Sequence, residues 1–155
     1  MSNLTSPEDF ETVLRFAFGI ADRGVPLTLV SMAMVSVAVE SDPALGDPGW
    51  ARDAEASLRE VIAGRCRRTD RVAEVEPGRY RALLAVCNRQ GALIYADRVV
   101  QACEDLFGDT GATVACGVAT WTPEMSSASE LIEASEDALE RARKMGGDRI
   151  EIHVG

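Results

Sequence analysis

The chain has 155 residues, of which 46% are hydrophobic and 26% are charged, and it carries a formal net charge of −9. This length suits one domain with its own apolar core, which needs no disulfide or structural metal to fold. A charge this negative repels phosphate backbones and anionic lipid surfaces, so it argues against bulk binding of nucleic acid or membranes. Any anion-binding site is expected to be local.

The cysteines and the single histidine have no spacing typical of a metal site. Cys66, Cys87, Cys103 and Cys116 form no C-x-x-C pair, and His153 is far from all of them in the sequence. The N-terminus has no apolar run of the signal-peptide type, and no segment has the roughly 20 apolar residues that span a membrane. We therefore expect a cytoplasmic protein with reduced thiols, no metal, no cofactor and no membrane insertion.

Hydrophobic periodicity and turn residues divide the chain into helices and strands. In chain order we expect a helix within residues 1–24, a strand over 25–39, a helix from 47 to 64, a hairpin over 68–86, a helix after Asn88 that reaches Leu106, a strand over 112–120, a helix over 128–145 and a strand over 148–154. Ser6 and Pro7 suit the start of the first helix, and Ser127 with Glu130 predicts a capping box for the last one. The apolar run 25–39 lacks any acidic residue, which is typical of a buried central strand.

The order of these elements predicts an α+β fold. Apart from the first helix and the last helix and strand, the order is strand, helix, strand, strand, helix, strand. This is the ferredoxin-like βαββαβ core, in which an antiparallel sheet is backed by helices on one face. No repeat, low-complexity segment or linker interrupts the chain. We therefore expect a single domain over 1–155, with an N-terminal helix over 1–24 and the core over 25–155.

Several segments, in this order, resemble those of the GGDEF family, the diguanylate cyclases that condense two GTP molecules into cyclic di-GMP. "TVACGVA" is similar to the family's T-V-S-x-G-V-A strand, and "ASEDALERARKMGGDRI" is similar to A-D-x-A-L-Y-x-A-K-x-x-G-R-N-R-V. "NLTSPEDFE" resembles a shortened D-x-L-T-G-L-x-N-R-R-x-F-E, and "PLTLVSMAMV" takes the place of the strand L-x-L-x-x-x-D-x-D. The resemblance spans nearly the whole chain. It implies a core of the nucleotidyl cyclase or palm type, with an extra N-terminal helix and a C-terminal helix and strand.

The chain departs from the family where the family's chemistry takes place. The signature G-G-D-E-F aligns with Glu76, Pro77, Gly78, Arg79 and Tyr80, so only the closing aromatic type is kept. The family's acidic residues on the hairpin and first strand hold metal ions, and here the first-strand acids are replaced by Ala33 and Val35. Magnesium requires hard oxygen ligands, which these side chains do not supply. The resemblance therefore predicts a pseudo-diguanylate cyclase that is not an enzyme.

Two further departures lie at the end of the last helix. The family's lysine, which is thought to hold the triphosphate, is Arg143 here with Lys144 beside it, and the arginine after the helix is Gly147. Arg143 and Lys144 are therefore retained only as weak candidates for contact with phosphate.

Glu76 and Arg79 flank the turn of the signature hairpin. Pro77 and Gly78 suit positions i+1 and i+2 of a type II turn, which explains the turn without a ligand. The two charged residues are either an acid–base pair of another enzyme or a cross-strand ion pair. We favour the ion pair, because a hairpin tip is usually wet; such a pair contributes only about 0–1 kcal/mol.

A short motif upstream of the hairpin resembles a ligand site of the family. Many GGDEF proteins carry an inhibitory product-binding motif R-x-x-D, and this chain has Arg67, Arg68, Thr69 and Asp70 at the family's spacing from the signature. Arginine can grip phosphate and lie over guanine, and a carboxylate can accept from its N–H groups. Arg98, on the next helix, is a candidate second contact. In the structural alternative, Arg67 lies at a helix C-terminus and Asp70 starts a turn.

Three functional hypotheses remain open. In the first, the chain is a catalytically inactive GGDEF-like domain with a regulatory role in bacterial signalling, exercised through an unidentified signalling protein or as a homodimer. Its contact surface is the hairpin 76–80, because arginine and tyrosine often anchor interfaces. In the second, the chain is a cyclic di-GMP receptor that uses Arg67 and Asp70. In the third, it retains some nucleotide binding or cyclase activity, with Arg143 and Lys144 on the triphosphate.

Overall fold

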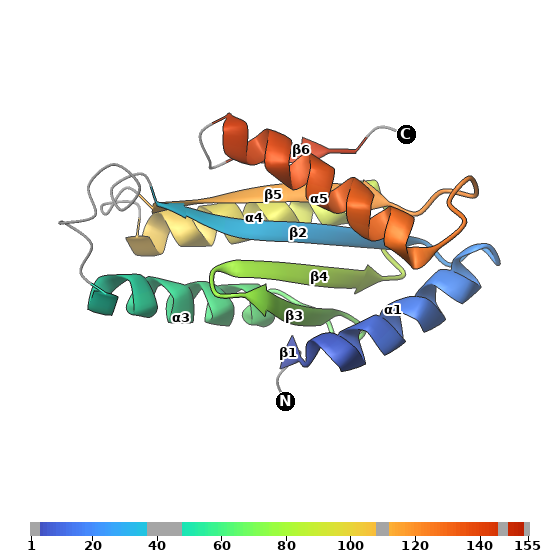
Figure 1. Cartoon of the computed structure of the whole chain (residues 1–155), viewed down its shortest axis with the longest axis horizontal. Coiled ribbons are helices and arrows are strands. Elements are labelled where there is room, and N and C mark those ends of the chain that lie inside the picture. The colour runs from blue at the N-terminus through green and yellow to red at the C-terminus, as the bar shows by residue number, and fades with distance from the viewer. Residues whose placement is uncertain (1–3, 37–47, 108–111, 146–148, 154–155) are drawn as a thin grey trace.

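The computed structural model describes residues 4–36, 48–107, 112–145 and 149–153 (Figure 1). Within this part of the chain, one mixed sheet has the strand order β1-β3-β4-β2-β5-β6. The strands are β1 (Leu4–Thr5), β2 (Leu27–Ser36), β3 (Arg71–Glu76), β4 (Arg79–Ala85), β5 (Ala112–Thr120) and β6 (Arg149–Ile152). The helices are α1 (Pro7–Ala21), α3 (Pro48–Gly64), α4 (Arg89–Phe107) and α5 (Ala128–Lys144). The α+β fold and the βαββαβ order predicted from the sequence are confirmed.

The four central strands are antiparallel, and the two edge pairings are parallel. β2 runs antiparallel to both β4 and β5, and β3 is antiparallel to β4. β1 is parallel to β3, and β6 is parallel to β5. The antiparallel sheet expected for the βαββαβ core is therefore confirmed, and the two edge strands outside that core are parallel to their neighbours. At one edge the reason is the connection through α5, since a helical crossover returns the chain in its original direction.

Helices cover both faces of the sheet, and the two helices of the βαββαβ core lie on one face, as expected. α3 and α4, the two helices of the βαββαβ core, pack on one face, while α1 and α5 pack on the other. In Figure 1, α5 lies in front of the sheet and α4 behind it. The central strand requires this arrangement, because Val30 and Met32 are buried toward α4 whereas Leu29 and Ala33 are buried on the opposite face. A strand that is apolar on both sides needs a helix on each.

The predicted start of α1 is confirmed in detail. The Ser6 hydroxyl accepts a hydrogen bond from the Asp9 amide at 3.1 Å, and Pro7 occupies the first turn. Gly24 follows the helix with a φ of 92°, a conformation that glycine adopts without strain. β1, which precedes α1, was not predicted, because a strand of two residues is too short to show an alternation of apolar and polar side chains.

The start of α5 differs from the predicted capping box. Ser127 is the N-cap, but its side chain makes no capping hydrogen bond. The Glu130 carboxylate instead accepts from the amide of Ser126 at 3.1 Å and from its hydroxyl at 2.5 Å. The glutamate therefore reaches one residue further back than expected, because Ser126 offers it two donors.

Gly117, in the middle of β5, determines how closely α5 approaches the sheet. A Cβ atom at this position would lie 2.2 Å from the amide nitrogen of Leu139 and 2.3 Å from the carbonyl oxygen of Ser135. Only glycine leaves room for this direct contact between backbones. The glycine of the segment "TVACGVA" thus has a packing role.

Some sequence-based expectations lie outside the described residues. They concern residues 37–39 of the first strand, Asp47, the turn over 108–111, Gly146, Gly147 and the ends of the last strand. Among the helices that the structure describes, none is both long and apolar enough to cross a membrane.

Candidate functional site

The hairpin between β3 and β4 carries the residues aligned with the family signature. Its turn has the expected backbone, since the φ of Gly78 is 81° and position i+2 of a type II turn requires about +80°. The Gly78 carbonyl accepts a hydrogen bond from the Met34 amide at 2.9 Å, and Ala33 pairs directly with Arg79 across the sheet. The two places where the family's metal ligands are expected are therefore neighbours in this chain.

Arg79 binds three carboxylates, which together with it we call the Arg79 cluster. Its Nη1 lies 3.2 Å from Glu76, and its Nη2 lies 3.3 Å from both Glu136 and Glu140 of α5. Arg143, which was a candidate phosphate contact, instead lies 3.1 Å from Glu140. The predicted ion pair between Glu76 and Arg79 is confirmed, but it is one contact of a larger network that joins the hairpin to α5.

Glu136 connects this cluster to the buried layer between α5 and the sheet. Its Oε1 accepts from Arg81 at 2.8 Å and from the Ser31 hydroxyl at 3.1 Å. Ser31 and Ser135 are fully buried, and their hydroxyl oxygens are 2.8 Å apart. The carboxylate is thus held by β2 and β4 together, which fixes the position of α5 over the hairpin.

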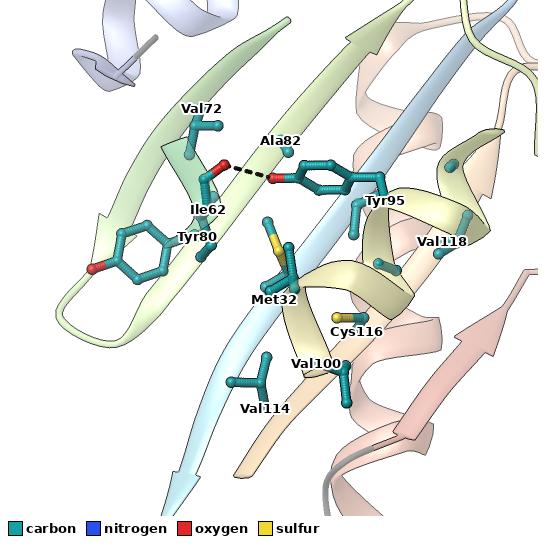
Figure 2. Packing of buried hydrophobic residues seen from close by; sticks show 14 of the residues in the cluster. Met32, Ile62, Val72, Tyr80, Ala82, Tyr95, Val100, Val114, Cys116 and Val118 are labelled. Atoms are coloured by element: carbon teal, nitrogen blue, oxygen red, sulfur yellow. Dashed lines mark hydrogen bonds between the residues drawn. The ribbon is translucent and has the colours of Figure 1, made fainter. Parts of the chain in front are cut away.

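Tyr80, on the opposite side of β4, is 1% exposed. Its hydroxyl donates to Glu74 at 2.9 Å, and Arg59 of α3 donates to the same carboxylate oxygen at 2.7 Å. Burial, together with the hydrogen bond to Glu74, raises the pKa of Tyr80 to about 12. Burial alone would raise the pKa of Glu74, but the hydrogen bonds from Arg59 and Tyr80 outweigh it and lower that pKa. Figure 2 shows Tyr80 within the core, with its hydroxyl oxygen pointing away from Tyr95.

These positions revise the surface expected over 76–80. Tyr80 is unavailable as an interface anchor because it is buried, and Arg79 is engaged by α5. The residues left exposed at the tip are Val75, Glu76 and Pro77. The hairpin tip is therefore a smaller and less arginine-rich surface than the sequence suggested.

The residues that the resemblance aligns with the family's metal ligands do not fit a divalent cation. Ala33 and Val35 are buried in an apolar cluster with Leu139 and Ala142, and position 79 holds a guanidinium. None of these side chains supplies an oxygen ligand. Across the described ranges, no group of three or more His, Cys, Asp or Glu side chains is arranged to hold a metal ion.

The R-x-x-D motif forms the turn that leads into β3. The Asp70 carboxylate is buried and accepts from the Arg67 amide at 2.8 Å, and Arg67 Nη2 donates to the Ala85 carbonyl at 3.1 Å. The carbonyl of Arg68 accepts from Arg71 at 2.7 Å. Asp70 thus has the structural role of a turn residue, whatever else it binds.

A pocket of about 210 Å³, which we call the arginine pocket, lies beside this turn. Arg67 and Asp70 line it together with Arg98 of α4, so three of the four candidate ligand residues meet there, while Arg68 does not line it. Arg65 is a fourth charged lining residue that the site prediction missed. The signal was present, because Arg65 belongs to the same basic cluster as Arg67 in the sequence.

The thiols near the arginine pocket are not poised as nucleophiles. Burial raises the pKa of Cys87, which lines the pocket, and it raises the pKa of the Cys66 thiol to about 11. Tyr95, another lining residue, donates to the Ile62 carbonyl at 3.2 Å (Figure 2). The pocket therefore combines exposed guanidinium groups with a buried wall that does not ionise near neutral pH.

The sheet order and the placement of the helices match the fold of the GGDEF domains of diguanylate cyclases, as solved structures show. No protein-family model matches the sequence, and no curated protein matches it closely enough to indicate a relative. The GGDEF domain of PA1120 (YfiN or TpbB) from Pseudomonas aeruginosa is similar with a TM-score of 0.82 and 18% identity, over 98% of each chain.

Two other similar structures represent different functional states. The active GGEEF domain of a diguanylate cyclase from Vibrio cholerae has a TM-score of 0.81 and 17% identity, over 93% of this chain and 94% of that one. The GGDEF domain of DgcB from Caulobacter crescentus in complex with c-di-GMP has a TM-score of 0.80 and 13% identity, over 97% of this chain and 91% of that one. Identities this low establish a common fold alone.

Proposed function

We propose that this chain is a catalytically inactive GGDEF-like domain that regulates bacterial signalling through protein contacts. The observation that supports this proposal best is the Arg79 cluster. It lies where the resemblance places the metal-binding carboxylates, and it puts a guanidinium beside the apolar Ala33.

Electrostatics at the hairpin favour loss of metal-dependent chemistry. Condensation of GTP requires divalent cations at the attacking and leaving oxygens, and such cations need hard anionic ligands. Here the carboxylates of Glu76, Glu136 and Glu140 are already paired with guanidinium groups, all three with Arg79, Glu136 also with Arg81, and Glu140 also with Arg143. A cation that entered would face a guanidinium at one ligand position and a methyl group at another, so it would gain too little to replace its hydration shell.

Incubation of the purified chain with GTP and magnesium tests the inactivity. We expect no cyclic di-GMP above a blank without protein, while an active GGDEF domain assayed in parallel forms product. A variant in which Lys144 and Arg143 are both changed to alanine serves as a matched control for trace contamination by an active enzyme. Product that forms with the wild type and is lost in this variant would overturn the proposal.

A second candidate function is cyclic di-GMP binding at the R-x-x-D motif. The meeting of Arg67, Asp70 and Arg98 in one pocket favours it, and DgcB, a similar domain, is described in complex with c-di-GMP. The pocket is smaller than the roughly 300–1,000 Å³ of typical ligand sites, so a dinucleotide would have to lie largely outside it. Calorimetry with cyclic di-GMP tests this candidate: heat that is lost in Arg67→Ala supports it, and no heat with the wild type rejects it.

A further inference from the structure

The arginine pocket concentrates positive charge in a small volume. Arg65, which directly follows α3, and Arg98 of α4 line it together with Arg67. The side chains of Arg65 and Arg98 are exposed and form no hydrogen bond or ion pair within the part of the chain that the structure describes. Among the lining residues, Asp70 is the one acid. Three guanidinium groups against one carboxylate leave the pocket with an excess of positive charge.

Apolar side chains form the rim of the same pocket. Ile94 of α4 lines the pocket and is 52% exposed. Val86 is 58% exposed and directly precedes Cys87, another lining residue. A free anion in the pocket would leave both apolar side chains in water, whereas a segment of another protein chain could cover them. The rim therefore favours a protein ligand.

The backbone at Val86 has a conformation that valine rarely adopts. Its φ is 50°, which lies in the left-handed region that is unfavourable for a β-branched residue. Hydrogen bonds on both sides hold it there, since the Ala85 carbonyl accepts from Arg67 at 3.1 Å and the Cys87 amide donates to the Pro26 carbonyl at 3.2 Å. Strain of this kind is concentrated at functional sites. Because the Val86 side chain is exposed, the strain serves contact with a partner rather than packing of the core.

The size and charge of the pocket match two acidic side chains. Its volume of about 210 Å³ is below the roughly 300–1,000 Å³ of typical small-molecule sites. A guanidinium group can form two parallel hydrogen bonds with one carboxylate. Since Arg65 and Arg98 come from different parts of the chain, each can hold a carboxylate of its own. Two neighbouring acids would then balance the excess positive charge.

We propose that the arginine pocket binds an acidic segment of a second, different protein. Two neighbouring aspartate or glutamate residues of that segment pair with Arg65 and Arg98, and an adjoining apolar residue covers Val86 and Ile94. The inference rests on the proposed function, because it gives the chemistry of the protein partner. The net charge of −9 repels acidic segments from the rest of the surface, so binding is confined to this pocket.

Selection of random peptides displayed on phage tests whether this chemistry is recognised. The immobilised wild type is expected to enrich peptides that have two neighbouring acids beside an apolar residue, and a variant with both Arg65→Gln and Arg98→Gln is expected not to. Arg89→Gln is the matched control, since it removes the same charge from α4 outside the pocket, and it should enrich the same peptides as the wild type. Peptides without an excess of acids, or the same peptides with the double variant, overturn the proposal.

The affinity of one enriched peptide, made synthetically and measured by fluorescence anisotropy, tests the two parts of the site separately. Arg98→Gln is expected to weaken binding by about tenfold, and so is replacement of the peptide's acids by their amides. Val86→Asn is expected to weaken it by about threefold through loss of apolar contact. Asparagine tolerates the left-handed backbone, so this variant should fold like the wild type. Unchanged affinity in both variants would contradict the proposal.

These outcomes are distinguishable from failure of the proposed function. The GTP assay reports on the hairpin, so an inactive chain can fail the peptide selection and an active one can pass it. Calorimetry with cyclic di-GMP separates the two kinds of ligand. If cyclic di-GMP binds the wild type and no acidic peptide does, the pocket is a nucleotide site and the proposal is wrong.

Discussion

The two ends of β4 use arginine in opposite ways. At the hairpin end, Arg79 and Arg81 are partly buried and bonded to carboxylates of α5. At the other end, Arg65 and Arg98 line the arginine pocket, and their side chains form no ion pair with the residues that the structure describes. In a chain of net charge −9, positive groups without an internal partner attract external anionic groups. The hairpin is therefore the closed end of this domain, and the arginine pocket is the end suited to bind an external anionic group.

The largest effect is expected from Gly117→Ala, because a side chain at this position prevents α5 from packing closely against β5. The new Cβ would overlap the backbone of α5, so the helix must move away from the sheet and from Arg79. We expect a loss of about 3 kcal/mol in the free energy of unfolding, measured by urea denaturation. Gly19→Ala is the control, because nothing lies within 4 Å of its added Cβ, and we expect it to stabilise α1 by about 0.5–1 kcal/mol. Equal effects of the two substitutions would contradict this account of α5 packing.

The next largest effect compares the two ends of β4 directly. Glu136→Gln leaves Arg81, whose side chain is 17% exposed, without its charged partner. We expect it to lower the free energy of unfolding by about 2 kcal/mol. Arg98→Gln, at the open end, is expected to change it by less than about 0.5 kcal/mol. If Arg98→Gln destabilises the fold as much as Glu136→Gln does, the distinction between closed and open ends fails.

A smaller effect is expected from Tyr80→Phe, which removes one hydrogen bond on the α3 side of the hairpin. The loss is expected to be about 1 kcal/mol near neutral pH. Because the pKa of Tyr80 is raised to about 12 in the folded state, its contribution is fully present below pH 10 and is lost as the pH rises from 10 to 12. The difference in stability between the wild type and Tyr80→Phe should therefore shrink over that range. A constant difference would mean that the hydroxyl titrates as it does in the unfolded chain.

Much of the fold was predictable because its signals are local. The cap of α1 at Ser6, the type II turn at Pro77-Gly78 and the ion pair between Glu76 and Arg79 each involve residues three or fewer positions apart. The continuous apolar run of β2 also identified the central strand. The same run, apolar on both sides, indicated that both faces of this strand are buried.

The rest of the candidate site depends on distant residues. Arg79 and its α5 partners are 57 and 61 positions apart, so only the packing of α5 over the hairpin brings them together. The burial of Tyr80 follows from β4 alternation combined with the position of α3, which the sequence does not specify. The arginine pocket was partly predictable, because the R-x-x-D motif was visible in the sequence, whereas its depth and the contribution of Arg65 were not.

Arg79 also constrains how this chain can change over evolutionary time. A carboxylate at position 79, as in the family signature, would face Glu76, Glu136 and Glu140 with only Arg81 and Arg143 left to balance four negative charges. Four negative groups in one place repel one another, so the substitution would be unfavourable unless a glutamate of α5 were lost first. An acidic hairpin in this chain therefore requires several substitutions in a particular order. Because Arg79 pairs with three carboxylates at once, substitutions that keep this guanidinium are more favourable than substitutions that replace it by an acid.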